Sequence, residues 1–364
     1  MTLARYRGTR VLVTGHTGFK GAWLVAWLLD QGAEVMGLAL APPTDRPSLF
    51  RDLALADRMR SAVVDIRDAE AVREAVAAFR PEIVFHLAAQ ALVRRSYADP
   101  LETFAVNVMG TAHVLEAARH TDSVRAVVCV TSDKCYENRE WVWGYRESDP
   151  MGGKDPYSAS KAAAEIVAGS YRQALMPGSR LRLATARGGN VIGGGDWSED
   201  RLVPDLVRAI RSRAPLVLRN PDAVRPWQHV LELLHGYLLL GARLLAADDA
   251  AVGAWNFGPA RASEVAVRRL VEQALAAWGG DPIPVQIEAS ALREAGILKL
   301  DAAKAEAELG WRPRLGFART VRLTMEWYRD YSARPTDARA LVEAQIAEYA
   351  RIAAASGHAD EDSA

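Results

Sequence analysis

Short apolar runs rich in β-branched residues alternate with longer amphipathic stretches in the first half of the chain. The runs are too continuously apolar to have one face in water, so they predict strands that are buried on both faces. Strands are expected at residues 10–15, 34–40, 61–66, 82–89, 125–132 and 181–187, and helices at 19–31, 68–79, 102–119 and 157–175. This alternation predicts an α/β protein with a Rossmann-like, doubly wound parallel sheet.

After about residue 188 the alternation breaks at GGNVIGGGDW, and helices are expected at 201–212, 230–246, 263–277 and 302–309. A chain of 364 residues exceeds the roughly 250–300 at which one core stops growing. We therefore expect a large domain over 1–187, joined by returning elements around 226–258, and a smaller α/β domain formed mainly by 188–350. Residues 351–364 are predicted to form a disordered tail.

Composition narrows the range of partners. With 45 basic and 45 acidic residues, the chain has no net charge to attract nucleic acid or an anionic membrane, so an anionic ligand needs a local site. No signal-peptide pattern and no apolar run of about 18 residues is present, which predicts a cytoplasmic protein. Two cysteines, Cys129 and Cys135, are too few for a disulfide framework or a zinc site. We expect no metal at the histidines, which lack partners at ligand spacing: His86, His113 and His229.

The segment TGHTGFKG, residues 14–21, directly follows the first predicted strand and opens a helix. Glycines at this turn let backbone N–H groups approach a pyrophosphate at the helix N-terminus. The pattern is also compatible with a tight strand-to-helix turn that binds nothing. If it holds a dinucleotide, the expected contacts are Gly15, Thr17, Gly18, Phe19, Lys20 and Gly21.

Two further stretches lie where a dinucleotide would extend. Asp65 and Ile66, after the third strand, could meet the adenine, and HLAAQ at 86–90 brings Leu87, Ala88 and Ala89 beside the cofactor. The acidic residue that usually binds the ribose hydroxyls is missing from LALAPPTDR, residues 38–46. NAD is favoured over NADP, but the choice stays open because Arg46 could meet a 2′-phosphate.

The segment DPYSASKAAAE, residues 155–165, places Tyr157 and Lys161 four residues apart, on one face of a helix. An ammonium close to a phenol is expected to lower the pKa of the phenol, which makes tyrosinate a usable base for a sugar hydroxyl. The alternative is a chance Tyr/Lys pair on a solvated helix face.

Together, GxxGxxG and YxxxK resemble the extended short-chain dehydrogenase/reductase family. Residues 131–161, 188–205 and 224–230 are similar, within that family, to the CDP-glucose 4,6-dehydratases of deoxysugar and polysaccharide biosynthesis, and the resemblance covers roughly 8–330. The related dTDP-glucose enzymes carry Thr-Asp-Glu after the fifth strand, whereas this chain has Ser132, Asp133 and Lys134. The resemblance implies bound NAD, CDP-glucose as substrate, and a homodimer or a dimer of such dimers.

The resemblance also implies a reaction in which C4 of the hexose is oxidised before water is removed. Tyr157, with Lys161, would take the O4 proton as hydride leaves C4. The C4 ketone acidifies the hydrogen at C5, which Lys134 would remove while Asp133 protonates the departing O6. Hydride then returns to C6. Adjacent residues at an irregular strand end can face one sugar edge, although a surface ion pair in a loop remains the alternative.

The expected substrate-binding residues are Gln90, Asn190, Arg201, Arg225 and Asn256, and Asn107 is assigned to the cofactor. For each arginine alone a solvated face is the commoner explanation, and Trp227 could belong to the core. The chain has Gly189 where those dehydratases usually carry alanine, and Gly296-Ile297 where they tend to carry His-Tyr. Neither departure is expected to touch the proposed chemistry.

Two other functions stay open: an epimerase or reductase of the same fold, and a cofactor-binding regulator that lost its chemistry. An intact Tyr157/Lys161 pair argues against a regulator, and an epimerase has no need of an acid/base pair aimed at C5 and C6. The helices at 102–119 and 157–175 carry more apolar surface than one sheet covers, which predicts that they pair across the two-fold axis of a dimer.

Overall fold

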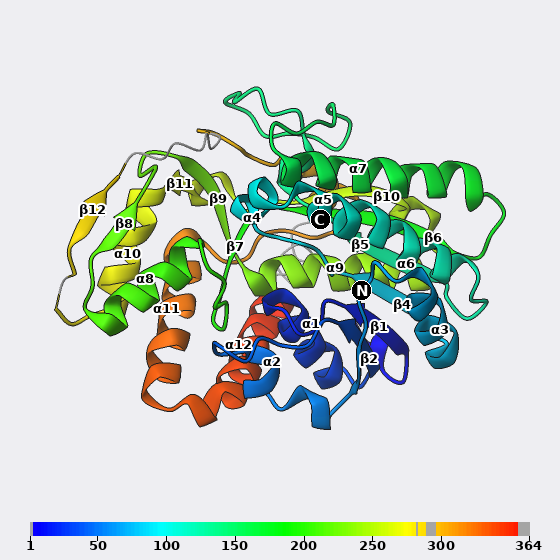
Figure 1. Ribbon diagram of the computed structural model, residues 1–364, viewed down its shortest axis with the longest axis horizontal. Helices are drawn as coiled ribbons and strands as arrows, with labels where there is room; N and C mark the ends of the chain where they lie inside the picture. The colour runs from blue at the N-terminus through cyan, green and yellow to red at the C-terminus, as the bar shows by residue number, and fades with distance from the viewer. Residues whose placement is uncertain (1–2, 282, 289–295, 356–364) are drawn as a thin grey trace.

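The computed structural model describes residues 3–281, 283–288 and 296–355. A parallel seven-stranded sheet forms its centre, in the order β10-β6-β5-β4-β1-β2-β3 (Figure 1). Its strands are β1 (Arg10–Thr14), β2 (Glu34–Ala39), β3 (Arg60–Val63), β4 (Ile83–His86), β5 (Ala126–Val130), β6 (Arg182–Gly188) and β10 (Gly253–Phe257). The predicted strands and the Rossmann-like parallel sheet are confirmed, and β10 adds one strand at the edge.

The strand order reverses between β1 and β4, which are neighbours in the sheet. Thr14 of β1 is the register partner of His86 on β4, and His86 is the partner of Cys129 on β5. The loops after these three strands therefore begin at one edge of the sheet. In open parallel sheets, ligands bind at this carboxyl edge near the point of reversal.

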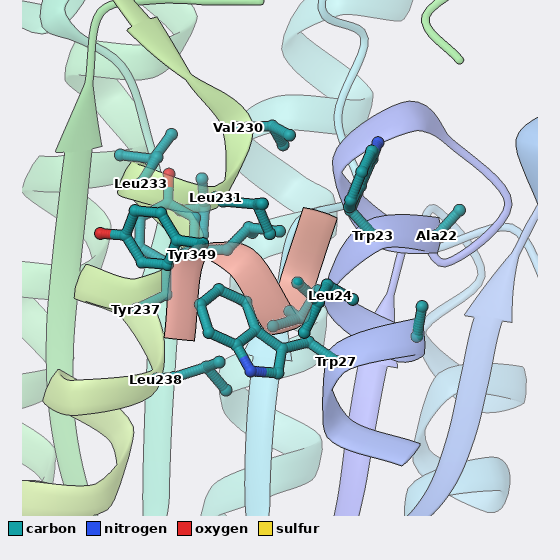
Figure 2. Packing of buried hydrophobic residues seen from close by; sticks show 14 of the residues in the cluster. Ala22, Trp23, Leu24, Trp27, Val230, Leu231, Leu233, Tyr237, Leu238 and Tyr349 are labelled. Atoms are coloured by element: carbon teal, nitrogen blue, oxygen red, sulfur yellow. The ribbon is translucent and has the colours of Figure 1, made fainter. Parts of the chain in front are cut away.

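Alternate residues of each strand point to opposite faces, so the sheet carries two hydrophobic cores. One core packs against α1 (Phe19–Asp30), α9 (Val230–Leu245) and α12 (Ala338–Ala355), and the other against α3 (Ala69–Phe79), α6 (Gly110–Arg119) and α7 (Pro156–Ser170). Figure 2 shows Trp27 of α1 facing Leu238 of α9, with Tyr349 of α12 beside them. The rings of Trp27 and Tyr349 meet edge to face, 5.7 Å between centroids.

The predicted helices at 102–119 and 157–175 are each interrupted. The first consists of α5 (Pro100–Phe104), a π-helical turn and α6, and the second of α7 followed by a π-helical turn at Tyr171–Leu175. The prediction of a helix from residue 263 is wrong, because Glu264–Ala266 form strand β11 before α10 (Val267–Trp278) begins. Three further helices were not predicted from the sequence: α2 (Leu49–Asp52), α4 (Val93–Ala98) and α11 (Phe317–Ala333).

Two smaller sheets lie beside the large one (Figure 1). They contain β7 (Asn190–Ile192), β9 (Val224–His229) and β11 in one, and β8 (Leu216–Leu218) and β12 (Val285–Ile287) in the other, next to α8 (Leu202–Ser212). The last helix, α12, packs against α1. Residues 351–355 are helical, so the predicted tail is wrong there, and 356–364 lie outside the described residues.

No helix in the described part of the chain is long and apolar enough to cross a membrane. The same residues hold no cluster of His, Cys, Asp and Glu arranged for a metal ion.

A buried ion pair fixes α7 to the sheet. Arg187 of β6 donates to both carboxylate oxygens of Glu165 on α7, at 2.9 and 2.8 Å, and both side chains are 4% exposed. Thr185 also donates to Glu165, at 2.8 Å. Two charges this deeply buried are tolerated only because each is paired and hydrogen-bonded.

We expect Arg187→Met to lower the free energy of unfolding by about 3–5 kcal/mol, because it leaves the Glu165 carboxylate buried without a counter-ion. Urea denaturation measures this. The control is Arg182→Met, which removes a pair with Asp249, whose side chain is 83% exposed, and should cost less than about 1 kcal/mol. Equal losses in the two variants would contradict the assignment.

Candidate active site

A cavity of about 790 Å³ opens at the carboxyl edge of the large sheet, between it and the smaller sheets. Its walls include the residues that follow β4, β5 and β6, together with parts of β7, β8 and β9. Nine basic and six acidic side chains line it. Because the whole chain is neutral, this excess makes the cavity a local site for an anion.

The turn after β1 requires glycines, because neighbouring backbone leaves no room for a Cβ atom. Gly15 has φ +76°, and a Cβ there would lie 2.8 Å from the backbone nitrogen of Ala88. A Cβ on Gly21 would lie 2.1 Å from the carbonyl oxygen of Gly15. Gly18 is the N-cap of α1 and offers no side-chain hydrogen bond, so the first N–H groups of the helix are left for a phosphate.

The residues predicted to bind the cofactor fall into two groups. Lining the cavity are Phe19, Lys20, Leu87, Ala89, Tyr157 and Lys161, whereas Gly15, Thr17, Gly18, Gly21, Asp65, Ile66, Ala88 and Asn107 lie outside its wall. Asp65 is paired with Arg67. Asn107 is buried, and its side chain bonds both backbone groups of Gln90 and the Ser160 hydroxyl, so it holds the loop after β4 in place.

The chain leaves β5 through an irregular turn, which brings successive side chains to the cavity. Ser132 is the N-cap of a 3-10 turn, Asp133–Cys135. Its hydroxyl accepts the Lys134 N–H at 3.2 Å and donates to Asp133 Oδ1 at 2.9 Å. Ser132, Asp133 and Lys134 all line the cavity, and Asp133 is only 2% exposed, which excludes a solvated surface carboxylate.

Asp133 is arranged as a proton donor. Burial raises the pKa of its carboxyl group, against the opposing effects of Lys134 and the Ser132 hydrogen bond. Its second oxygen, Oδ2, is buried without a hydrogen-bond partner. A protonated carboxyl with one uncommitted oxygen on a cavity wall can donate a proton to a ligand there.

Tyr157 and Lys161 lie on the first turns of α7, and Lys134 Nζ lies 5.9 Å from the centre of the Tyr157 ring. The expectation that Lys161 lowers the pKa of Tyr157 is wrong for the protein alone. Burial raises that pKa to about 12, with a hydrogen bond to Ser132 opposing it. Lys161 is itself buried, which lowers its pKa, and its Nζ lies 3.4 Å from the Val130 carbonyl oxygen.

Of the predicted substrate-binding residues, Asn190, Arg201 and Arg225 line the cavity. Asn256 and Gln90 are not among the lining residues, and the side chains of both are hydrogen-bonded within the fold. Asn256 is buried and its amide donates to the carbonyl oxygens of Tyr145 and Asp301, at 2.8 and 3.1 Å. The Gln90 side chain is similarly occupied within its own loop.

Gly189 lies closer to the reacting groups than expected. A Cβ at this position would lie 3.3 Å from Asp133 Oδ2 and 2.8 Å from Pro226 Cγ. The expectation that this departure stays clear of the chemistry is therefore wrong. Gly296, the other departure, donates its N–H to Glu140 at 2.9 Å and accepts from Arg225 at 3.2 Å.

Sequence reasoning missed several charged residues of the cavity. Asp200 pairs with Arg94 at 3.6 Å and with Arg219 at 3.0 Å, and Asp196 pairs with Arg201 at 3.6 Å. Only Asp196 stood in a recognised motif, GGGDW. Arg46 does not line the cavity, and its nearest charged partners are Asp45 and Glu199.

A parallel sheet whose first strand leads into a glycine turn, with Tyr157 and Lys161 above the same edge, defines a short-chain dehydrogenase/reductase. A family model described as GDP-mannose 4,6 dehydratase matches residues 12–324, and the chain belongs to this family.

The most informative relative is CDP-glucose 4,6-dehydratase of Salmonella typhimurium, which is 48% identical over 89% of this chain and 91% of that protein. UDP-glucose 4-epimerase of Mycolicibacterium smegmatis is 29% identical over 89% of this chain and 99% of the epimerase. Among solved structures, the dTDP-glucose 4,6-dehydratase DesIV from Streptomyces venezuelae, with NAD bound, is 28% identical, with a TM-score of 0.77 over 90% of this chain and 100% of that chain.

We expect Asp133→Asn to become more stable relative to the native protein as pH rises. A folded-state pKa above the ordinary value of 3.8 means that the unfolded chain releases this proton first, so native stability is lost as pH rises through that range. The amide has no such proton. Urea denaturation at about pH 3 and about pH 8, on either side of the range that begins at the ordinary pKa of 3.8, measures the difference, and a difference that is the same at both would contradict a raised pKa.

Proposed function

We propose that the chain catalyses the NAD-dependent dehydration of CDP-D-glucose to CDP-4-keto-6-deoxy-D-glucose. One observation carries the proposal: Asp133 and Lys134 line the same cavity as Tyr157 and Lys161. An oxidation site thus adjoins a proton donor and an amine. The 48% identity to a CDP-glucose 4,6-dehydratase supports the substrate, since this relative spans nearly the whole chain.

The turn at Gly15, Gly18 and Gly21 fits a dinucleotide, because it brings bare backbone to the N-terminus of α1. NAD is the cofactor, and its nicotinamide supplies a hydride acceptor for C4 and later the same hydride for C6. Phe19, Leu87 and Ala89 would hold its inner half.

The residues of the chain move the protons. Tyr157 accepts the O4 proton as a phenolate while C4 is oxidised, and the Ser132 hydrogen bond and the charge of Arg201 favour this ionised form against burial. The ketone acidifies C5, so Lys134 removes that hydrogen as Asp133 protonates O6, and water leaves. Hydride then adds to C6 and a proton returns to C5, which gives a 4-keto-6-deoxy sugar with no net change in the cofactor. The positive excess of the cavity holds the diphosphate.

A UDP-glucose 4-epimerase is the second candidate, favoured by the relative that is 29% identical. Epimerisation returns hydride to C4 and needs neither an acid at O6 nor a base at C5, so it does not account for Asp133 and Lys134 in the cavity. Incubating the protein with CDP-, UDP-, dTDP- and GDP-glucose decides between them. Mass spectrometry should find loss of water from CDP-glucose, whereas galactose formation without loss of mass would overturn the proposal.

We expect Lys134→Met to stop the reaction after the first oxidation. The thioether side chain keeps much of the length but cannot accept the C5 hydrogen, so turnover should fall roughly 10²–10⁴-fold. In deuterated water the native enzyme labels C5, whereas the variant should show reduced-cofactor absorbance without label.

Tyr157→Phe is the matched comparison, because it should stop the reaction one step earlier and give neither label nor reduced cofactor. If Lys134→Met labelled C5 as fast as the native enzyme, Lys134 would be an electrostatic partner rather than the base.

We further propose a homodimer formed through α5, α7 and the π-helical turns next to them. Apolar side chains on these segments are exposed in the single chain, with Leu101 80%, Met109 52% and Ile166 63% exposed. Helices that present such a face commonly pair with their copies across a two-fold axis.

Sedimentation at micromolar concentration should therefore give twice the mass of the chain. Ile166→Asp together with Leu101→Asp should produce monomers, because each charge would be buried in the interface. Val142→Asp is the control, since Val142 is 72% exposed but lies outside these helices, and it should leave the dimer intact. A native monomer would contradict the proposal.

A further inference from the structure

Lys20 extends from the first turn of α1 into the cavity. Four charged groups act on it, from four places in the fold: Arg201 before α8, Lys161 on α7, Asp133 after β5 and Asp196 in the loop after β7. Burial is the main influence and lowers the pKa of Lys20 to about 7. Repulsion from Arg201 and Lys161 adds to it, against the two carboxylates.

The two carboxylates do not neutralise Lys20. Asp196 is already paired with Arg201, at 3.6 Å, and burial favours the protonated form of Asp133. Among the described residues, no hydrogen bond or ion pair holds Lys20 Nζ. Lys20, Lys161 and Arg201 thus line one cavity, and in the described structure only Arg201 of these three is paired with a carboxylate there. An anionic ligand would therefore stabilise the three together.

We propose that Lys20 binds the diphosphate of the nucleotide sugar beside Arg201 and takes up a proton as it does so. The proposal rests on the proposed function. Arg201 and Asp196 belong to the segment that leads into α8, on the side of the smaller sheets, whereas the glycine turn offers its backbone N–H groups to the cofactor. An anion held between Lys20 and Arg201 therefore lies inside the cavity and belongs to the substrate.

The coupling has a definite sign. Above about pH 7 the free protein holds Lys20 increasingly as the neutral amine, and a bound diphosphate favours the ammonium. Binding therefore draws a proton from solution, and affinity falls as pH rises above that value. A bound anion also favours the protonated form of Asp133, so the substitutions at Lys20 decide which of the two groups takes up the proton.

Calorimetric titration tests the proposal in the NAD-loaded Tyr157→Phe protein, in which CDP-glucose binds without turnover. The diphosphate of CDP-glucose is esterified at both ends, so the ligand itself carries no phosphate proton that titrates near neutral pH. Binding heats measured at about pH 8 in two buffers of different ionisation enthalpy give the number of protons taken up. We expect most of one proton per site.

Three further substitutions locate the proton. Lys20→Met should abolish the uptake and weaken CDP-glucose binding roughly tenfold or more, the effect of one charged hydrogen bond. Lys20→Arg should restore affinity without uptake, since arginine stays charged, and it remains informative if the methionine variant does not fold. Lys134→Met, which removes a different lysine of the same cavity, should keep the uptake.

Uptake that persists in Lys20→Met or Lys20→Arg would overturn the proposal, as would weakened binding of NAD with unchanged binding of CDP-glucose. Failure of the proposed function is distinguishable, because CDP-glucose would then not bind to any variant. UDP-glucose carries the same diphosphate but a different nucleobase. Binding heats measured with it would therefore test the role of Lys20 independently of which nucleobase the protein prefers.

Discussion

The exclusion of solvent from the cavity at the carboxyl edge of the sheet governs the chemistry of this protein. Burial is the largest influence on Asp133, Tyr157, Lys161 and Lys20, and in each it favours the uncharged form. The uncharged form suits Asp133, which must bring a proton to O6, whereas Tyr157 must be ionised before it can accept the proton of O4. The basic side chains that outnumber the acidic ones in the cavity remain available to bind the diphosphate, whose negative charge balances theirs.

The geometry depends on two local devices. A 3-10 turn capped by Ser132 lets adjacent residues just after β5 face one cavity, which a regular strand would not allow. The buried pair between Glu165 and Arg187 then fixes α7 against the sheet, so that Tyr157 stays opposite that turn. Strand order explains why these elements meet, because β1, β4 and β5 end level beside the point of reversal.

The sequence predicts the large sheet well because strands buried on both faces leave continuous apolar runs, and the Gly15 turn and the Tyr157/Lys161 pair follow fixed spacings. It does not predict what depends on distant partners. Asn256 looks like any polar residue near a site until Tyr145 and Asp301 occupy its amide. The pKa of Tyr157 likewise reflects a balance between burial and nearby charges that spacing cannot weigh, and the contact of α12 with α1 leaves no local pattern.

The most direct test of the account follows one hydrogen atom through the reaction. CDP-glucose carrying deuterium at C4 is converted in ordinary water, and the product is analysed by mass spectrometry and NMR. The account predicts that the deuterium is found at C6 of a 4-keto-6-deoxy sugar, because the hydride removed during oxidation returns after water has left. Deuterium kept at C4, or a product that has lost no water, would contradict it.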